Sequence, residues 1–277
     1  MAEPLTLMSV HAHPDDEASG GGILAAYADQ DVRTIVVTCT NGELGDAPGG
    51  IKPGQPGHDM TEVARLRLAE LAESARILKL SDVETLGYHD SGMLDWDYKD
   101  RPDVFANVPM DEIAGRIGDL IAKYRPQVLV TYDDNGAYQH PDHVRASQAA
   151  QAAAKETGIP AKVYLSTFHS RSWRRIWEAR RAAGEEMPDF VLDEEMQRRA
   201  RESEERITTT IDVRPVLGRK RDALFAHGSQ VNESWFGSIP PEVFTDAFGD
   251  EYFIRVADTT GAPVPESDLF AGLRDGA

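Results

Sequence analysis

The chain has 277 residues, 41% of them hydrophobic and 27% charged, which is ordinary for a globular protein with one large domain. Its 47 acidic residues against 29 Lys and Arg leave a formal net charge of −18. This charge argues against nucleic-acid and anionic-membrane partners, because phosphate binding needs clustered basic side chains. No stretch approaches the roughly 18 apolar residues of a membrane span. The single cysteine, Cys39, cannot form an internal disulfide, so we expect a cytoplasmic location.

Strands and helices are predicted to alternate along the first part of the chain. Apolar, β-branched runs predict strands over residues 5–10, 34–40, 83–86, 127–132 and 163–168. Amphipathic or alanine-rich segments between them predict helices over residues 18–29, 61–80, 111–124 and 141–155. This alternation is typical of an α/β fold with a Rossmann-like, doubly wound, mostly parallel sheet flanked by helices.

The second part of the chain begins with a segment dense in Arg and Glu, residues 171–206, which predicts one or two surface helices. It continues with predicted strands over residues 207–213 and 251–256 and a predicted helix over residues 216–226. We therefore expect a core over residues 1–170 and a smaller C-terminal α+β extension over residues 171–277, which completes the binding pocket of one structural unit.

Two clusters of histidine and aspartate follow predicted strands. Residues 11–17 read His-Ala-His-Pro-Asp-Asp-Glu, and residues 133–143 read Asp-Asp-Asn-Gly-Ala-Tyr-Gln-His-Pro-Asp-His. Together they contain four of the eight histidines in the chain. Because ligands of such sheets bind at the carboxyl ends of the strands, we expect both clusters to face one crevice. The Gly- and Pro-rich loop over residues 41–58 is predicted to border it.

Imidazole and carboxylate groups suit zinc and similar divalent ions, and a catalytic zinc takes about three protein ligands plus a water. The turn over residues 13–16 can place two side chains on one ion. His140 and His143 are three residues apart at the start of a helix, so only one of them needs to be a ligand, and the spacing leaves open which. The surplus carboxylate and imidazole are then available for proton transfer, as in a hydrolase.

Two other interpretations fit less well. A glycine run follows the first strand, but the G-x-G-x-x-G spacing of a dinucleotide site is missing, and carboxylates stand where a pyrophosphate would lie. A metallophosphoesterase commonly holds two metals with more ligands than these clusters provide.

Both clusters resemble signatures of the PIG-L/LmbE-like zinc-dependent N-deacetylases. Residues 12–17 resemble the A-H-P-D-D-E signature, and residues 138–143 resemble the second signature, which ends in H-P-D-H. The resemblance extends through residues 67–71, 90–93 and 220–230, segments typical of the actinobacterial branch that includes the mycothiol-pathway deacetylase and the mycothiol S-conjugate amidase.

The resemblance implies residue roles. His13, Asp16 and His143 would be the metal ligands, for Zn²⁺ or for Fe²⁺ or another divalent ion. Asp15 would be the general base, and His140 would stabilise the tetrahedral intermediate or protonate the leaving amine. The choice of His143 over His140 as ligand comes from the resemblance alone.

Four further positions carry implied roles. Tyr138 would polarise the substrate carbonyl, and Asp142 would orient the neighbouring imidazole. Arg67 and Asp90 would line a sugar pocket. The implied reaction is metal-dependent hydrolysis of the amide of an N-acyl, chiefly N-acetyl, amino sugar or its glycoside, which is a small-molecule substrate.

The chain departs from the family pattern at two positions. Gly20 stands where the S-conjugate amidases tend to carry a lysine, and Gln139 stands where glycine or proline is frequent. The alternative activities are therefore a mycothiol S-conjugate-type amidase or a natural-product tailoring deacetylase. An alternative of another class is a catalytically inactive homologue that binds a metal and a glycoside. The spare base at Asp15 argues against the inactive homologue, because binding alone needs no base.

Overall fold

The computed structural model describes residues 4–93, 95–182, 184, 194–232 and 239–274. These residues contain one seven-stranded sheet with the order β3-β2-β1-β4-β5-β7-β6. The strands are β1 (Thr6–His11), β2 (Arg33–Thr40), β3 (Asp82–Tyr88), β4 (Val128–Tyr132), β5 (Lys162–Thr167), β6 (Thr209–Asp212) and β7 (Asp250–Asp258).

The sheet is mostly parallel, as the alternation of strands and helices predicts. Strands β3, β2, β1, β4 and β5 are mutually parallel, whereas β7 pairs antiparallel with β5 and β6 antiparallel with β7. The strand order reverses between β1 and β4, since the chain winds from β1 towards β3 and then returns to β4 on the other side. Ligands of doubly wound sheets bind at this point, and both histidine–aspartate clusters follow these two strands.

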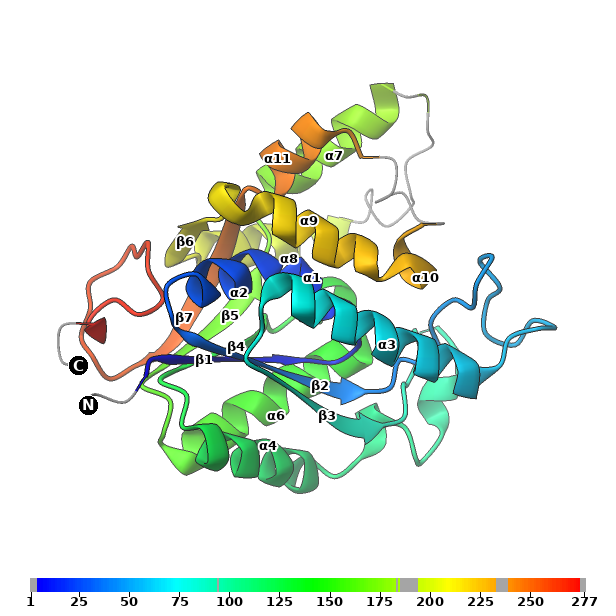
Figure 1. Ribbon diagram of the computed structural model, residues 1–277, viewed down its shortest axis with the longest axis horizontal. Helices are drawn as coiled ribbons and strands as arrows, with labels where there is room; N and C mark the ends of the chain where they lie inside the picture. Colours follow the sequence, from blue (N-terminus) through cyan, green and yellow to red (C-terminus); the bar gives the residue numbers. More distant parts are fainter. Residues whose placement is uncertain (1–3, 94, 183, 185–193, 233–238, 275–277) are drawn as a thin grey trace.

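Helices cover both faces of the sheet (Figure 1). One face carries α2 (Gly21–Ala28), α3 (Met60–Leu78) and α9 (Leu217–Ala226), and the other carries α4 (Met110–Tyr124) and α6 (Pro141–Thr157). Each face has its own cluster of buried apolar side chains against the sheet. The α/β, doubly wound architecture is therefore confirmed.

The helix predicted over residues 18–29 is instead two helices, α1 (Asp16–Ser19) and α2, separated at Gly20. The carboxylate of Glu251 on β7 accepts hydrogen bonds from the backbone N–H groups of Gly22 (2.8 Å) and Ile23 (2.9 Å) at the start of α2. A Cβ on Gly22 would lie 2.5 Å from Glu251 Oε1, so only glycine allows this approach. The break falls in the glycine run over residues 20–22, and its partner Glu251 is more than two hundred positions away in the sequence.

The Arg- and Glu-rich segment forms two helices, α7 (Ser170–Ala182) and α8 (Glu194–Glu205), within the predicted range, while residues 185–193 lie outside the described residues. Helix α7 lies beside α11 (Pro241–Phe248), which the sequence did not predict (Figure 1). Strands β6 and β7 join the same sheet as the first five strands. The shorter helices are α5 (Gly136–Gln139), α10 (Gly228–Val231) and 3₁₀ turns at Asp97–Asp100, Phe105–Asn107 and Arg214–Val216.

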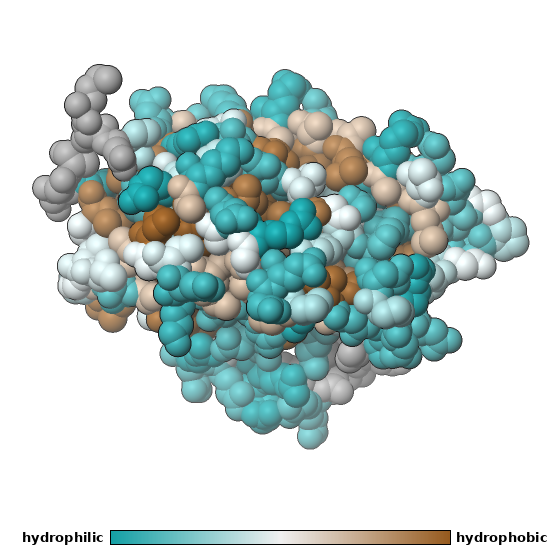
Figure 2. Space-filling view, turned by 90° about the horizontal axis from the view of Figure 1, so that it is seen from below, coloured by the Kyte–Doolittle hydropathy of each residue, from teal (hydrophilic) through white to brown (hydrophobic). Residues whose placement is uncertain are grey.

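The face seen from below is mostly hydrophilic, and its hydrophobic residues form small separate patches (Figure 2). Among the described residues, no helix combines the length and apolar character that crossing a membrane requires. Cys39 on β2 is buried and unpaired, as expected for a small core residue.

Candidate metal centre and active site

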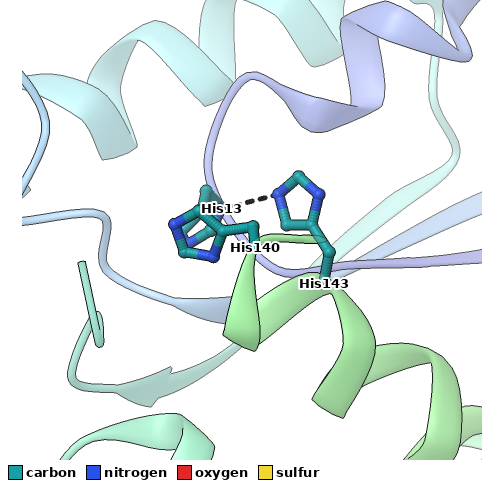
Figure 3. A group of neighbouring side chains, drawn as sticks. All are labelled: His13, His140 and His143. Carbon is teal, nitrogen blue, oxygen red and sulfur yellow. Dashed lines mark hydrogen bonds between the residues drawn. The ribbon is translucent and has the colours of Figure 1, made fainter. Parts of the chain in front are cut away.

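The turn after β1 and the first turn of α6 bring together three side chains that the sequence proposes as metal ligands. His13 Nδ1 lies 3.2 Å from His143 Nε2 and 3.3 Å from Asp16 Oδ2, and His143 Nε2 lies 3.3 Å from Asp16 Oδ1. Figure 3 shows His13 and His143 facing one another, with His140 beside His13. Both of these ligand histidines are almost fully buried.

These separations fit one small divalent ion. Donors about 2.0–2.1 Å from a tetrahedral zinc lie about 3.3 Å from each other, which matches the observed spacing of the three groups. Two imidazoles and one carboxylate are also a donor set that zinc and iron accept. The residues present therefore fit a bound metal. His140 also brings a ring nitrogen within 4.8 Å of ligand atoms on His13 and His143.

Hydrogen bonds turn the two ligand imidazoles towards the centre. His143 Nδ1 lies 3.2 Å from the carbonyl oxygen of Gly136, which can only accept, so Nδ1 carries the proton and Nε2 is free for a metal. His13 Nε2 lies 3.2 Å from Asp142 Oδ2, which leaves Nδ1 as the ring atom available to a metal. Asp142 is itself held by the backbone N–H (3.0 Å) and the hydroxyl of Ser91. Asp142 thus orients His13.

The charge balance of the centre favours a cation. Burial lowers the pKa of His13, but the carboxylates of Asp90, Asp142 and Asp16 outweigh burial and hold this pKa well above its usual range. Burial raises the pKa of Asp16, yet His143 and His13 bring it well below the ordinary value. The carboxylates therefore draw a positive charge into the cluster, and a metal ion can replace the proton that His13 otherwise keeps.

His140 has different surroundings from His143. Its Nδ1 accepts a hydrogen bond from the backbone N–H of Asp142 (3.2 Å), which caps the start of α6. Burial, followed by the neighbouring imidazoles of His13 and His143, lowers the pKa of His140 to about 2. A neutral ring with an acceptor at Nδ1 carries its proton on Nε2, so His140 can donate a hydrogen bond to an oxyanion.

Asp15 precedes the predicted metal ligand Asp16 and has an unusual backbone, with φ at 121°. Such a positive φ is strained in a residue other than glycine, and strain of this kind is common at active sites. The carboxylate of Asp15 pairs with Arg67 across 3.0 Å. Burial and the nearby Asp16 raise the pKa of Asp15, although Arg67 opposes the shift.

Tyr138 lies at the entrance of the centre, with 49% of its surface exposed. Its ring packs edge-on against His140 and His143, at centroid distances of 5.8 and 5.1 Å. The neighbours Ala137 and Gln139 have positive φ angles of 62° and 66°. Glycine would be less strained than glutamine at position 139.

The two predicted sugar-pocket residues are both buried. Arg67 on α3 donates hydrogen bonds to the carbonyl oxygens of Gly42 (2.8 Å) and Pro14 (2.5 Å), besides its pair with Asp15. Asp90 Oδ1 accepts from the backbone N–H of Gly92 (2.8 Å) and lies 3.6 Å from His13 Nε2. All nine predicted site residues thus gather around one centre, and Arg67 contacts protein groups there.

Sequence reasoning missed several residues that support this site. Tyr132 donates its hydroxyl hydrogen to Asp16 Oδ2 (2.7 Å), and Ser91 holds Asp142. Glu17 accepts the backbone N–H of Asp15 (2.9 Å) and pairs with the distant His227 (2.6 Å). Ser91, Glu17 and His227 all fall in segments that carry the family resemblance, which is the signal that could have identified them.

The loop over residues 41–58 joins the site through its first residues. Arg67 bonds both the carbonyl of Gly42 and that of Pro14, in the turn over residues 13–16. The amide side chain of Gln230 bonds the backbone N–H (3.2 Å) and carbonyl (3.0 Å) of Asp46. Glu43 pairs with His89 at 2.6 Å. The loop is therefore fixed against α3, α10 and the segment after β3.

Known proteins are similar to this chain in sequence and fold. A deacetylase of Acidothermus cellulolyticus, named 1D-myo-inositol 2-acetamido-2-deoxy-alpha-D-glucopyranoside deacetylase, is 35% identical over 97% of this chain and 95% of its own length. The mycothiol S-conjugate amidase of Streptomyces coelicolor is 32% identical over the full length of both chains. The N,N'-diacetylchitobiose deacetylase of Pyrococcus horikoshii shares the fold, with a TM-score of 0.59 and 17% identity over 92% of this chain and 84% of its own.

A family assignment follows from these matches. Residues 8–154, which contain both histidine–aspartate clusters, match the PIG-L family, described as GlcNAc-PI de-N-acetylase. This region spans more than half of the chain and includes most of β1, the parallel strands β2, β3 and β4, and most of α6. Together with the near full-length similarity to the actinobacterial deacetylase, it shows that the chain belongs to the PIG-L family of de-N-acetylases.

Proposed function

We propose that this chain hydrolyses the amide bond of an N-acetyl amino sugar or its glycoside, which releases the free amine and acetate. The observation that carries the proposal is the arrangement of His13, Asp16 and His143 with donor atoms 3.2–3.3 Å apart and a spare carboxylate, Asp15, in the same turn. The similarity to deacetylases acting on N-acetylglucosaminyl inositol supports this substrate class.

The proposed cofactor is zinc, or Fe²⁺ or another divalent ion, held by His13 Nδ1, Asp16 and His143 Nε2. When bound, such an ion polarises the substrate carbonyl and makes water acidic enough to attack near neutral pH. Asp142 and the Gly136 carbonyl keep the two imidazoles in the tautomers that ligation requires.

The surrounding residues then divide the proton transfers and the charge stabilisation. Asp15 takes a proton from the attacking water and passes it to the leaving nitrogen, so that the C–N bond breaks with a neutral amine as product. His140 donates a hydrogen bond from Nε2 to the developing oxyanion, and Tyr138, whose ring packs against His140 and His143, is proposed to donate a second one from its hydroxyl. A good donor of this kind contributes about 3–4 kcal/mol to the transition state.

We further propose that residues 171–277 complete the substrate pocket. Arg199 of α8 bonds Gln139 (3.0 Å), and Ser203 of the same helix bonds Asn135 (3.2 Å), so the extension contacts the loop that carries Tyr138. The loop over residues 41–58 borders the opposite side and is proposed to select the acyl group or aglycone. The free Cys39 is consistent with a cytoplasmic enzyme.

The test is a fluorescent assay for free amine with N-acetylglucosaminyl inositol, before and after incubation with a chelator. We expect turnover by the protein as purified, loss of turnover with chelator and recovery with added zinc. Turnover that is unchanged after the metal has been removed would contradict the proposal. A protein that binds zinc and the glycoside but releases no amine would instead be the inactive homologue.

A second candidate is a mycothiol S-conjugate-type amidase, because one full-length relative carries that name. The two substrates can be compared in the same assay by their kcat/KM values. Gly20 favours the deacetylase, because S-conjugate amidases tend to have lysine there. A Cβ at Gly20 would meet no atom within 4 Å, so we expect Gly20→Lys to fold, and this variant tests whether the lysine shifts the preference.

A further inference from the structure

The turn that carries Asp15 is held by a buried carboxylate that plays no part in the proposed metal site. Glu17 Oε2 accepts the backbone N–H of Asp15 at 2.9 Å. Glu17 is fully buried, and its other oxygen, Oε1, accepts from Ser74 Oγ (2.5 Å) on α3 and from His227 Nε2 (2.6 Å) after α9. The carboxylate of Glu17 thus connects the turn that carries Asp15 to α3 and to the end of α9, which lie on the same face of the sheet.

The bond to Glu17 acts where the backbone is strained. Asp15 has a φ of 121°, a conformation that a residue with a Cβ adopts only when its surroundings enforce it. The N–H of Asp15 is the group whose direction changes most directly with this φ, and it points at Glu17. The carboxylate of Asp15 is fixed from the other side by Arg67.

His227 in turn fixes Glu17. Its ring is fully buried, and Nε2 must carry the proton because its partner is a carboxylate oxygen. The residues that follow His227 also contact neighbouring segments. Ser229 donates to Glu70 on α3 through its N–H (2.7 Å) and hydroxyl (2.6 Å). Gln230 bonds Asp46 in the loop over residues 41–58. The segment after α9 therefore reaches α3, the loop over residues 41–58 and the catalytic turn.

We infer that Glu17 and His227 are positioning residues for Asp15: the buried pair holds the strained turn so that the Asp15 carboxylate faces the attacking water. Neither residue touches the substrate or the reacting atoms. The inference rests on the proposed function for its effect on turnover, whereas the hold on the turn is a property of the chain itself.

The test compares His227→Ala with His227→Gln, whose side-chain amide can still donate to Glu17. Glu266→Gln serves as the matched control, because Glu266 is also a buried carboxylate with several partners, but it contacts Lys162 at the amino end of β5, away from the site. We expect His227→Ala to lower kcat about 10–100-fold with KM and bound zinc unchanged. His227→Gln should recover most of the loss, and Glu266→Gln should leave kcat unchanged.

Amide hydrogen exchange of the metal-free proteins provides a readout that does not depend on activity. We expect faster exchange over residues 14–19 in His227→Ala than in the wild type, and wild-type exchange there in Glu266→Gln. If His227→Ala misfolds, Ser74→Ala takes its place: it removes the other side-chain donor to Glu17 and is a milder form of the same change.

Unchanged exchange over residues 14–19 in both His227→Ala and Ser74→Ala would overturn the inference. So would a loss of kcat in His227→Ala that His227→Gln does not relieve. If the wild type releases no amine from any N-acetyl amino sugar, the proposed function fails, and the exchange comparison still decides whether this pair holds the Asp15 turn.

Discussion

Two clusters of buried carboxylates lie at opposite ends of the parallel strands, and their negative charges have different partners. At the amino end of β5, Glu266 pairs with Lys162 (2.5 Å) and Arg255 (2.9 Å) and accepts from Tyr164 (2.8 Å). At the carboxyl end of β1, Asp16 and two further carboxylates surround His13. In the described part of the chain, no Lys or Arg forms an ion pair with Asp16, Asp90 or Asp142.

The difference separates a structural cluster from a functional one. A buried charge without a fixed partner is costly, so the cluster around Glu266 is complete as folded, whereas the cluster around His13 needs a positive charge from outside. A divalent cation supplies it, and its place at the carboxyl ends of β1 and β4 is where doubly wound sheets bind ligands. Four predictions test this contrast.

The largest effect should follow metal removal. Chelation should reduce amine release to background, because substrate activation is lost, and zinc should restore it. It should also lower the melting temperature, since an ion that binds the native state at about 1,000 times its Kd adds about 4 kcal/mol of stability. The measurement is a melting curve with and without chelator. A wild-type melting temperature that does not respond to chelator would contradict the idea that the cluster needs an outside cation.

Asp15→Asn should lower kcat by about 10²–10⁴-fold, the usual contribution of a general base. Asparagine has the same shape and tolerates positive φ, so the turn should persist. Steady-state kinetics together with elemental analysis check this. Near wild-type kcat, or loss of bound zinc, would show that Asp15 is not the base.

Asp142→Asn should weaken zinc binding about 10–100-fold, because Asp142 fixes the orientation of His13 without being a ligand itself. Competition with a chromophoric chelator measures the affinity. A loss of zinc as complete as in His13→Ala would instead make Asp142 a ligand.

Glu266→Gln should leave kcat and bound zinc unchanged while it lowers the free energy of unfolding by about 3–5 kcal/mol, because Lys162 and Arg255 lose a buried partner. Denaturant unfolding measures the stability. A fall in kcat at a temperature where the variant is folded would mean that the two clusters are coupled.

Much of the fold could be predicted from local pattern. The five parallel strands and the helices α3, α4 and α6 lie close to their predicted bounds, because most of the strands are apolar, β-branched runs and the helices are unbroken amphipathic or alanine-rich segments. The break between α1 and α2 was missed although it falls in the glycine run over residues 20–22, and the bonds of Glu251 on β7 to the start of α2 could not be predicted from local pattern. Helix α11 was missed because it is short and follows prolines.

The sequence was enough to predict which residues form the candidate site, but not which residues they contact. The position of Asp15 and Asp16 directly after β1, and of His143 in the helix that follows β4, agrees with the predicted topology. That Asp142 orients His13, that Arg67 bonds the catalytic turn and that His227 holds Glu17 depends on tertiary packing across more than fifty residues. No periodicity or spacing in the sequence encodes such partners.

The most direct test of the central claim is calorimetric titration of zinc into metal-free wild type, His143→Ala and His140→Ala. The geometry predicts one tight site per chain in the wild type, loss of that site in His143→Ala and its retention in His140→Ala, whose imidazole caps α6. No zinc binding by the wild type, or loss of the site in His140→Ala with retention in His143→Ala, would contradict the account.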